Sequence, residues 1–369
     1  MSFKTTAYQS DEVHIYYNIE MTNNQDKPIP LSFTDYRNQP LFSDHPEDYQ
    51  MAITRFQIPC SSLPWTFFPS VNDDGITPDN AYYRVSIPYK NAWYTAYVTF
   101  VPQGGLPNTD INYLGIYSIQ SLVDMINQAI LTAFNLVVAA YPADFPTLEC
   151  AYLLYDSANG FINYIAPTVN FNSAMLRVYF DTTLYLLFDN LFSYYYPDGV
   201  VSGTLNADAN YWLIAKNTGN NVITSAPPFG FGPASSSYEM KAEFKNLGQL
   251  SSAKSIVFTS ANLPVSGEFI PTSSFNTSLN TSSSFRNILT DFELLLDSPN
   301  GQGLRSIQQF YNSGEYRLID LSGTTGIKVV DLQAYYSDSK LRLRPIMLPV
   351  NSYCSVKILF RRKSFKGGL

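Results

Sequence analysis

The stretch VHIYYNIEM at residues 13–21 alternates between two kinds of side chain over its whole length. The five odd-numbered residues are apolar, whereas His14, Asn18 and Glu20 on the other parity are polar. Successive side chains of a strand point to opposite faces, so this pattern predicts a β-strand with one buried face. Residues 356–361, near the other end of the chain, alternate in the same way. We therefore expect both ends to contribute strands to the same kind of sheet.

Shorter segments of strand character recur between these ends. In residues 51–58 the apolar residues change parity, which predicts a β-bulge near Arg55. Segments 151–156 and 161–165 are joined by a linker that contains Asn159-Gly160, and Asn-Gly favours a hairpin. Further strand candidates are 82–88, 93–101, 175–180, 255–260, 288–296, 316–321 and 327–336. The sequence thus predicts a mainly β protein.

One segment has helical spacing instead. Its apolar residues recur three and four positions apart, at Ile119, Leu122, Val123, Ile126, Ile130, Ala133, Phe134 and Val137. Its expected polar face carries Gln120, Asp124, Asn127, Gln128 and Asn135. Ser118 is the expected N-cap, and Pro142 follows the expected end. We predict a single helix that covers a sheet; a polar face without Lys or Arg argues against a membrane-surface role.

Composition separates the middle of the chain from its ends. The Gly- and Pro-rich residues 103–108 and 227–233 bracket a stretch that is rich in aromatic residues. Within residues 101–240 ten acidic residues occur, but the basic residues are only Arg177 and Lys216. We predict one β-sandwich made of residues 1–103 and 238–369, split by an inserted β-rich domain at 104–237 that contains the helix.

Aromatic residues are unusually frequent, with 28 Tyr and 25 Phe among 369 residues, while only 14% of residues are charged. The low charge argues against a disordered chain. Tyr suits half-buried sheet faces and protein interfaces. The tyrosines are therefore candidates for contacts between subunits.

The C-terminal segment is strongly basic. From Lys340 to Leu369 there are eight basic residues and no acidic one, although the whole chain has a net charge of -7. A solvated edge strand guarded by basic residues would explain this. The functional alternative is contact with a polyanion such as packaged nucleic acid, through sequence-independent phosphate pairing. The candidate contact residues are Lys357, Arg361, Arg362, Lys363 and Lys366.

Catalytic and metal-binding patterns are lacking. The two histidines, His14 and His45, and the three cysteines, Cys60, Cys150 and Cys354, are scattered, and no nucleotide-binding, hydrolase or zinc motif occurs. We expect no catalytic residues, no metal and no cofactor. The 30 acidic residues leave one enzymatic alternative open, a carbohydrate-binding or glycoside-hydrolysing β-sandwich.

The start of the chain, MSFKTTAYQSDEV, lacks the apolar core of a secretory signal. The run from Ala129 to Tyr141 is interrupted by polar residues and is too short to span a bilayer. Because the cysteines also lack a disulfide pattern, we expect an intracellular product without a membrane span.

Four segments at the two ends of the chain resemble a known family. They are YRNQPLFSDHPEDYQMAITRFQIP (36–59), RNILTDFELLLD (286–297), GEYRLIDLSG (314–323) and VVDLQAYYSDSKLRLRPIMLPVNSYCSVKILFRRK (329–363). Over residues 13–100 and 285–363 the chain is similar to the penton, or minor capsid, proteins of virophages and polinton-like viruses, and in particular to those of Sputnik-like virophages.

This resemblance implies a single jelly roll with an inserted, outward-projecting domain that could serve attachment. It implies homopentamers at the vertices of an icosahedral double-stranded DNA virus, in contact with a neighbouring major capsid protein. The family is not enzymatic, so no catalytic residue carries over. The expected location is the virion, with assembly in the host cytoplasm. An inward-facing basic tail would then contact the packaged DNA.

Overall fold

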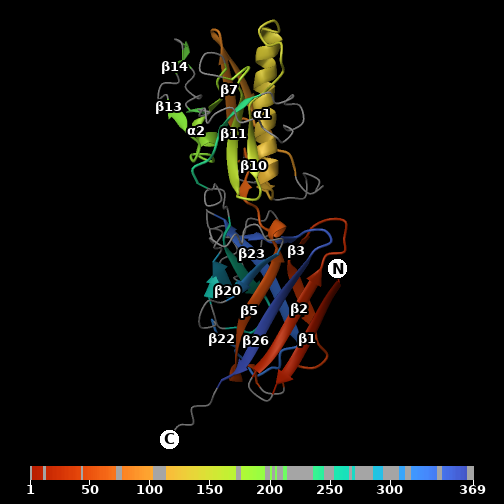
Figure 1. Ribbon diagram of the computed structural model, residues 1–369. Coiled ribbons are helices and arrows are strands. Elements are labelled where there is room, and N and C mark those ends of the chain that lie inside the picture. The colour runs from red at the N-terminus through yellow and green to blue at the C-terminus, as the bar shows by residue number, and fades with distance from the viewer. Residues whose placement is uncertain are drawn as a thin grey trace. The chain divides into compact units, whose positions relative to one another are not determined.

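The structure is a computed structural model. It describes residues 2–10, 14–42, 45–71, 77–102, 114–171, 176–195, 200–201, 204–205, 211–213, 236–244, 253–265, 268–270, 286–293, 307–311, 317–338 and 343–363. Its contacts divide the chain into two compact units. Unit 1 comprises Met1–Pro64 and Ser251–Leu369, and unit 2 comprises Trp65–Leu250 (Figure 1).

The first sheet of unit 1 is built from both ends of the chain. Its strands, in spatial order, are β1 (Ser2–Ser10), β2 (His14–Thr22), β26 (Tyr353–Arg362), β5 (Tyr49–Pro59) and β21 (Ile307–Tyr311), and β22 (Ile319–Asp320) also pairs with β5. Strands β2 and β26 are antiparallel along their whole length, from His14 opposite Arg361 to Thr22 opposite Tyr353. This confirms the expectation that the two alternating ends of the chain belong to the same sheet.

A β-bulge interrupts the pairing of β5 with β26, as the change of parity predicts. Lys357 lies opposite Arg55, whereas the next residue, Ile358, lies opposite Ile53, so Thr54 is the extra residue. The Thr54 hydroxyl donates a hydrogen bond to the carbonyl oxygen of Lys357 at 3.2 Å. The bulge lets apolar residues on both sides of Thr54 point into the core and leaves Arg55 on the opposite face.

The second sheet of unit 1 faces the first. Its strands, in order, are β19 (Glu268–Ile270), β20 (Arg286–Glu293), β18 (Ala253–Ser260), β23 (Val329–Asp338) and β24 (Leu343–Pro345), and β4 (Ser32–Tyr36) also pairs with β23. A small pair is formed by β3 (Ile29–Pro30) and β25 (Met347–Leu348). The ring of Phe56 on β5 meets that of Phe258 on β18 edge to face, with centroids 4.7 Å apart. The chain crosses between the sheets from β4 to β5 and from β23 to β26, so unit 1 is a β-sandwich of the predicted jelly-roll type.

A buried carboxylate fixes the turn after β18. Asp331 on β23 is 3% exposed. It accepts hydrogen bonds from the Ser260 hydroxyl and from the backbone N–H groups of Ala261 at 2.8 Å and Asn262 at 2.9 Å. These donors compensate the carboxylate for the water it loses on burial. The turn is thereby held against the core of unit 1.

Unit 2 combines one long helix with two small sheets (Figure 1). The helix α1 (Ile119–Ala140) contacts both sheets, through β10 (Tyr152–Asp156) in one and through β7 (Arg84–Tyr89) and β8 (Ala92–Tyr97) in the other. One sheet has the order β10 (Tyr152–Asp156), β11 (Phe161–Pro167) and β17 (Ser237–Met240). The other has the order β13 (Ser193–Tyr195), β16 (Tyr211–Leu213), β12 (Tyr179–Phe180), β7 (Arg84–Tyr89) and β8 (Ala92–Tyr97).

Several short elements lie outside these larger sheets. They are the strand pairs β6 (Thr66–Phe67) with β9 (Gly115–Ile116) and β14 (Val200–Val201) with β15 (Thr204–Leu205), the one-turn helix α2 (Thr182–Tyr185), and the 3-10 turns η1 (Pro46–Asp48) and η2 (Cys60–Ser62). The predicted hairpin is confirmed by β10 and β11, and Gly160 at its turn has a φ of 74°, a value that favours glycine.

The helix begins and ends where the sequence predicts, with one correction to its faces. The Ser118 hydroxyl accepts a hydrogen bond from the N–H of Ser121 at 3.3 Å and so caps the helix. Asn127, expected on the polar face, is instead buried. Its side chain donates to the carbonyl oxygen of Leu153 at 2.9 Å and accepts from the N–H of Leu153 at 2.7 Å. The side chain thus acts as a strand partner for β10.

The unit boundaries differ from the predicted domain boundaries. Unit 2 begins at Trp65 and ends at Leu250, whereas we expected the insertion to be 104–237. The reason is that β7 and β8, which we had assigned to the outer sandwich, pair with β12 and pack against α1 in unit 2. The Gly- and Pro-rich residues 103–108 therefore connect elements of one unit.

The helix α1 also bears on the expectation of no membrane span. Within the described ranges it is the one helix long and apolar enough to cross a membrane, because it extends beyond the run from Ala129 to Tyr141 at its N-terminal end. The run itself is too short to span a bilayer, as expected, but the length of the whole helix does not exclude a span. The apolar face of α1 is buried in the core of unit 2, and this burial accounts for its composition.

Candidate functional site

The basic residues near the C-terminus do not form one cluster. Lys357 and Arg361 lie on β26, on the parity opposite to the buried Val356, Ile358 and Phe360. They therefore belong to the face of the six-stranded sheet opposite to these three residues; on that face Arg361 is exposed, Lys357 is half-buried, and Leu359 between them is buried. Arg362 follows on the other parity and is half-buried. Lys366 lies outside the described residues.

Lys363 already has an acidic partner. Its Nζ lies 3.3 Å from Oδ1 of Asp320, and Gln50 Nε2 donates to the same oxygen at 2.8 Å. The hydrogen bonds from Gln50 and Lys363, together with the charge of Lys363, lower the pKa of the Asp320 carboxyl. Because Asp320 offsets its charge, Lys363 has less to offer a polyanion than Lys357 and Arg361.

The sheet register adds a residue that the sequence analysis missed. Arg55 lies directly opposite Lys357 on the neighbouring strand β5, and both are half-buried. On the other side of Lys357 its Nζ lies 5.3 Å from the centre of the Tyr16 ring. We refer to Arg55, Lys357 and Arg361 as the basic strip. The change of parity in residues 51–58 could have identified Arg55. The bulge that it predicts places Arg55 opposite Lys357.

The six-stranded sheet that carries the basic strip has two acidic residues, Glu20 on β2 and Asp320 on β22, and Asp320 lies opposite Gln50, the residue that lies opposite Arg361. Across the sequences of β2, β26 and β5, Glu20 is the only acidic residue. His14 lies opposite Arg361, and its ring stacks with that of Tyr16 at a centroid distance of 6.5 Å. This part of the sheet thus combines cationic and aromatic side chains, a combination that suits contact with phosphate groups.

The two units differ in charge. Unit 1 contains 17 Lys and Arg against 16 Asp and Glu, so its formal charge is +1. Unit 2 contains 6 Lys and Arg against 14 Asp and Glu, so its formal charge is -8. The acidity of the chain therefore resides in unit 2, and a polyanion would be repelled there.

The tyrosines serve two purposes. Tyr17, Tyr152, Tyr164, Tyr179 and Tyr336 are almost completely buried and fill the cores. A second group is exposed and consists of Tyr36, Tyr82, Tyr97, Tyr194, Tyr195 and Tyr353, with Tyr36 the most exposed at 78%. The frequency of Tyr thus reflects core packing as well as surface chemistry.

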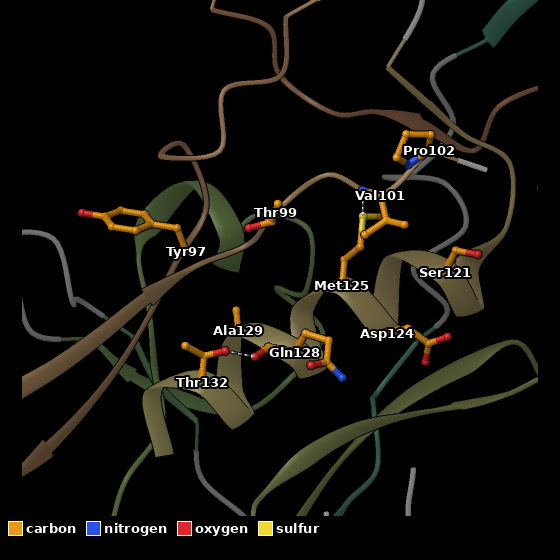
Figure 2. A pocket seen from close by; sticks show the side chains of 10 residues that line it. All are labelled: Tyr97, Thr99, Val101, Pro102, Ser121, Asp124, Met125, Gln128, Ala129 and Thr132. Atoms are coloured by element: carbon orange, nitrogen blue, oxygen red, sulfur yellow. Dashed lines mark hydrogen bonds between the residues drawn. The ribbon is translucent and has the colours of Figure 1, made fainter. Parts of the chain in front are cut away.

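A groove in unit 2 lies between the segment from Tyr97, at the end of β8, to Pro102 and the helix α1 (Figure 2). Its volume is about 470 Å³. The strand side contributes Tyr97, Thr99, Val101 and Pro102, and the helix side contributes Ser121, Asp124, Met125, Gln128, Ala129 and Thr132. Asp124 is the only charged residue in this lining.

The chemistry of the described residues fits no metal centre. No group of three or more His, Cys, Asp or Glu side chains comes together in the described ranges. Cys150 and Cys354 are free thiols in the core, and burial raises the pKa of both, that of Cys354 to about 12. A thiol of such high pKa is a poor nucleophile.

Comparison with known proteins gives a consistent result. A family model described as Sputnik minor capsid protein V18/19 matches residues 15–362. The structural protein V19 of Sputnik virophage is 27% identical over 219 residues, which cover 57% of this chain and 93% of that protein. The uncharacterized protein V18 of the same virophage is 28% identical over 154 residues, which cover 36% of this chain and 89% of that protein.

Two solved structures share the fold. A chain in the cryo-EM structure of the Sputnik virophage aligns with a TM-score of 0.69 and 23% identity, over 97% of this chain and all of the other. The crystal structure of the mavirus penton protein aligns with a TM-score of 0.57 and 14% identity, over 95% of this chain and all of the other. Both alignments extend over the two units together.

Proposed function

Because the chain belongs to the Sputnik minor capsid protein V18/19 family, we propose that five copies of it form each vertex of an icosahedral virophage capsid. The family match confirms the resemblance seen in the sequence, and the protein is a structural minor capsid protein of the virion. The observation that carries the proposal is the shared fold with a penton protein over nearly the whole chain. Structural relatives of this kind also favour a non-enzymatic role over the carbohydrate-active alternative.

A five-fold ring sets a physical requirement that the chain can meet. Each subunit must present two different faces to its two neighbours, because a ring contact is heterologous. Burying charged groups in such contacts is costly, and only 14% of the residues are charged. Exposed tyrosines of unit 1, such as Tyr36 and Tyr353, offer rigid contact area. The remaining partner would be the neighbouring major capsid protein.

The solution mass of the purified chain tests the proposal. One chain has a mass of 41.5 kDa. A closed ring of five copies should give about 207 kDa in native mass spectrometry. A mass of one or two chains at every concentration up to that used for particle assembly would count against the pentamer.

We propose further that the basic strip contacts the packaged double-stranded DNA. Support comes from its cationic side chains and from the presence of only one acidic residue, Glu20, on the strands β2, β26 and β5. Replacing Lys357 and Arg361 with Ala should weaken DNA binding of the assembled protein and reduce its salt dependence, by a slope of about 2 if each contacts one phosphate. The control is Lys254→Ala, which removes an exposed lysine from the other sheet. Equal losses in both variants, or none in either, would contradict this role.

For unit 2 we propose a role in attachment. Support comes from its position as an insertion between the two segments of unit 1 and from its distinct charge. Such a domain would project outward from the shell, as expected for this type of protein. Particles assembled from a chain without residues 65–250 should bind host cells or a helper virus less well than intact particles. Normal attachment of those particles would rule out the role.

A further inference from the structure

Among the described strands, β8 lies at one edge of its sheet and ends at Tyr97, and residues 98–102 follow it without regular secondary structure. The N–H of Val98 donates to the carbonyl oxygen of Tyr83 at 2.9 Å, and the N–H of Phe100 donates to Oδ1 of Asn80 at 2.9 Å. Both donors are therefore used on the side of β7. Within β8 the N–H of Tyr97 faces away from β7, because successive N–H groups of a strand point to opposite sides. The hydrogen bonds of Val98 and Phe100 continue this alternation past the end of β8, so that the N–H groups of Thr99 and Val101 also face away from β7.

These outward donors are poorly satisfied. The N–H of Val101 donates to Sδ of Met125 at 3.2 Å, and a thioether sulfur is a weak acceptor. For the N–H groups of Tyr97 and Thr99, the part of the chain that the structure describes supplies no acceptor. Both residues are exposed. The edge thus presents a row of three donors to whatever lies beside it.

The groove of about 470 Å³ lies along this edge (Figure 2). Its other wall is the helix α1, whose Ser121, Asp124, Gln128 and Thr132 follow one another along the helix. Met125 and Ala129, both nearly buried, complete the lining. The volume lies in the range of ligand-binding sites. A strand edge therefore forms one side of a groove, and polar helix residues form the other.

The charge of the groove restricts its ligand. Asp124 carries the only charge in the lining and is exposed, and one of its oxygens accepts from Gln120 Nε2 at 2.8 Å. Unit 2 as a whole is acidic. A phosphate or another anion would be repelled, whereas a ligand with a basic side chain would be attracted.

The edge formed by β8 also lacks the residues that usually keep an exposed strand from pairing with another strand. Exposed edge strands often carry Lys or an internal Pro, because free backbone groups recruit other strands. Residues 91–109 contain no charged residue, and the first Pro after β8 is Pro102. Within residues 91–101, therefore, neither a charged side chain nor a Pro protects this edge.

We propose that this groove binds an extended polypeptide segment of a partner protein, which adds as a strand to the edge of β8. Carbonyl oxygens of the segment accept hydrogen bonds from the N–H groups of Tyr97 and Thr99 and replace Met125 Sδ at Val101. Alternate side chains of the segment point into the groove, and a Lys or Arg among them pairs with Asp124. All the groups concerned lie in unit 2 of one chain, so this inference does not depend on the pentamer or on a role in attachment.

A selection of peptides tests the proposal. Random nonapeptides displayed on phage are selected against immobilised full-length protein, and the most enriched peptide is synthesised for fluorescence anisotropy. We expect enriched sequences to contain Lys or Arg and to alternate in polarity. Thr99→Pro removes one outward N–H and should weaken binding of the synthetic peptide about tenfold or more, the cost of one lost hydrogen bond. Thr99→Ala keeps this N–H and should change binding much less.

Two further measurements make the test specific. Asp124→Asn should weaken binding and flatten its salt dependence, whereas Glu243→Gln removes an acid elsewhere in unit 2 and should do neither. In the wild type, peptide binding should slow amide hydrogen exchange at Tyr97 and Thr99, a readout that requires no variant. Absence of enriched peptides, equal binding to Thr99→Pro, or unchanged exchange at both amides would overturn the proposal. Binding of cellotriose in place of any peptide would also overturn it.

Discussion

Units 1 and 2 are stabilised in different ways. In unit 1, β2 pairs with β26 over nine residues, and the two sheets share an aromatic core that includes Phe56 and Phe258. In unit 2, the strands β12, β13 and β16 have two or three residues each, and the long helix α1 supplies much of the core. Short strands cannot stabilise a sheet alone, so unit 2 depends on its helix.

Among the substitutions that test how differently the two units are stabilised, we expect Phe134→Ala to have the largest effect. Phe134 is completely buried in α1, and its ring lies against those of Phe145 and Phe171. Its loss should lower the free energy of unfolding of unit 2 by about 4 kcal/mol. Peptide-level hydrogen exchange should show faster exchange in unit 2 and no change in unit 1. Leu136→Ala, an exposed position of the same helix, serves as the control. Equal loss of protection in both units would break the comparison.

A corresponding change in unit 1 is Asp331→Ala. It removes the buried carboxylate that accepts hydrogen bonds from the Ser260 hydroxyl and from the N–H groups of Ala261 and Asn262; the Asn262 N–H keeps Ser260 Oγ as a second acceptor at 3.2 Å. We expect a loss of about 3 kcal/mol, confined to unit 1 and measured by urea unfolding. The control is Asp291→Ala, which removes an exposed acid that pairs with Arg317 at 2.8 Å and should cost below about 1 kcal/mol. Similar losses in the two variants would show that the turn after β18 is not held by Asp331.

Asn127→Ala tests the junction of helix and sheet in unit 2. Both hydrogen bonds to the backbone of Leu153 would be lost in a buried site, at a cost of about 2 kcal/mol. Thermal unfolding monitored by circular dichroism measures this loss. Asn135→Ala removes the same side chain from an exposed position of α1 and should leave the unfolding temperature nearly unchanged. If Asn127→Ala behaved like the control, the link between α1 and β10 would not contribute to stability.

The smallest effect concerns Lys363 and Asp320 in unit 1. Because Gln50 and Lys363 lower the pKa of Asp320, the ionised carboxylate stabilises the folded state at neutral pH. This contribution is present above the pKa of the unfolded chain and is lost as pH falls through the lower pKa of the folded state. Lys363→Ala should move the pKa of Asp320 back toward its ordinary value, which NMR titration of the carboxyl carbon measures. An unchanged pKa would mean that Lys363 is free to bind a polyanion.

The parts of the fold that the sequence predicted are those that repeat over many residues. The alternation in residues 13–21 and 356–361 and the helical spacing after Ser118 each identified an element, because one face of each element is buried along its whole length. The boundary of unit 2 was missed because β7 and β8 have the same local pattern as strands of the sandwich. Only their pairing with β12 and their packing against α1, both distant in sequence, assign them.

The candidate site was predicted in part for the same reason. The basic composition of the C-terminal segment identified Lys357 and Arg361. It could not identify Arg55, which strand pairing brings opposite Lys357, or the ion pair of Lys363 with Asp320, because these partners lie far apart in the chain. Asn127 was placed on the wrong face because helical spacing does not reveal that an amide can pair with a strand edge. The groove beside β8 depends on an unpaired edge, which no local pattern encodes.

We propose that five copies of this chain form each five-fold vertex of the capsid. A cryo-EM reconstruction of purified particles tests it most directly. We expect density at each five-fold position that accommodates five copies of unit 1. Density for this chain in the hexagonal facets, or its absence from the particles, would contradict the claim.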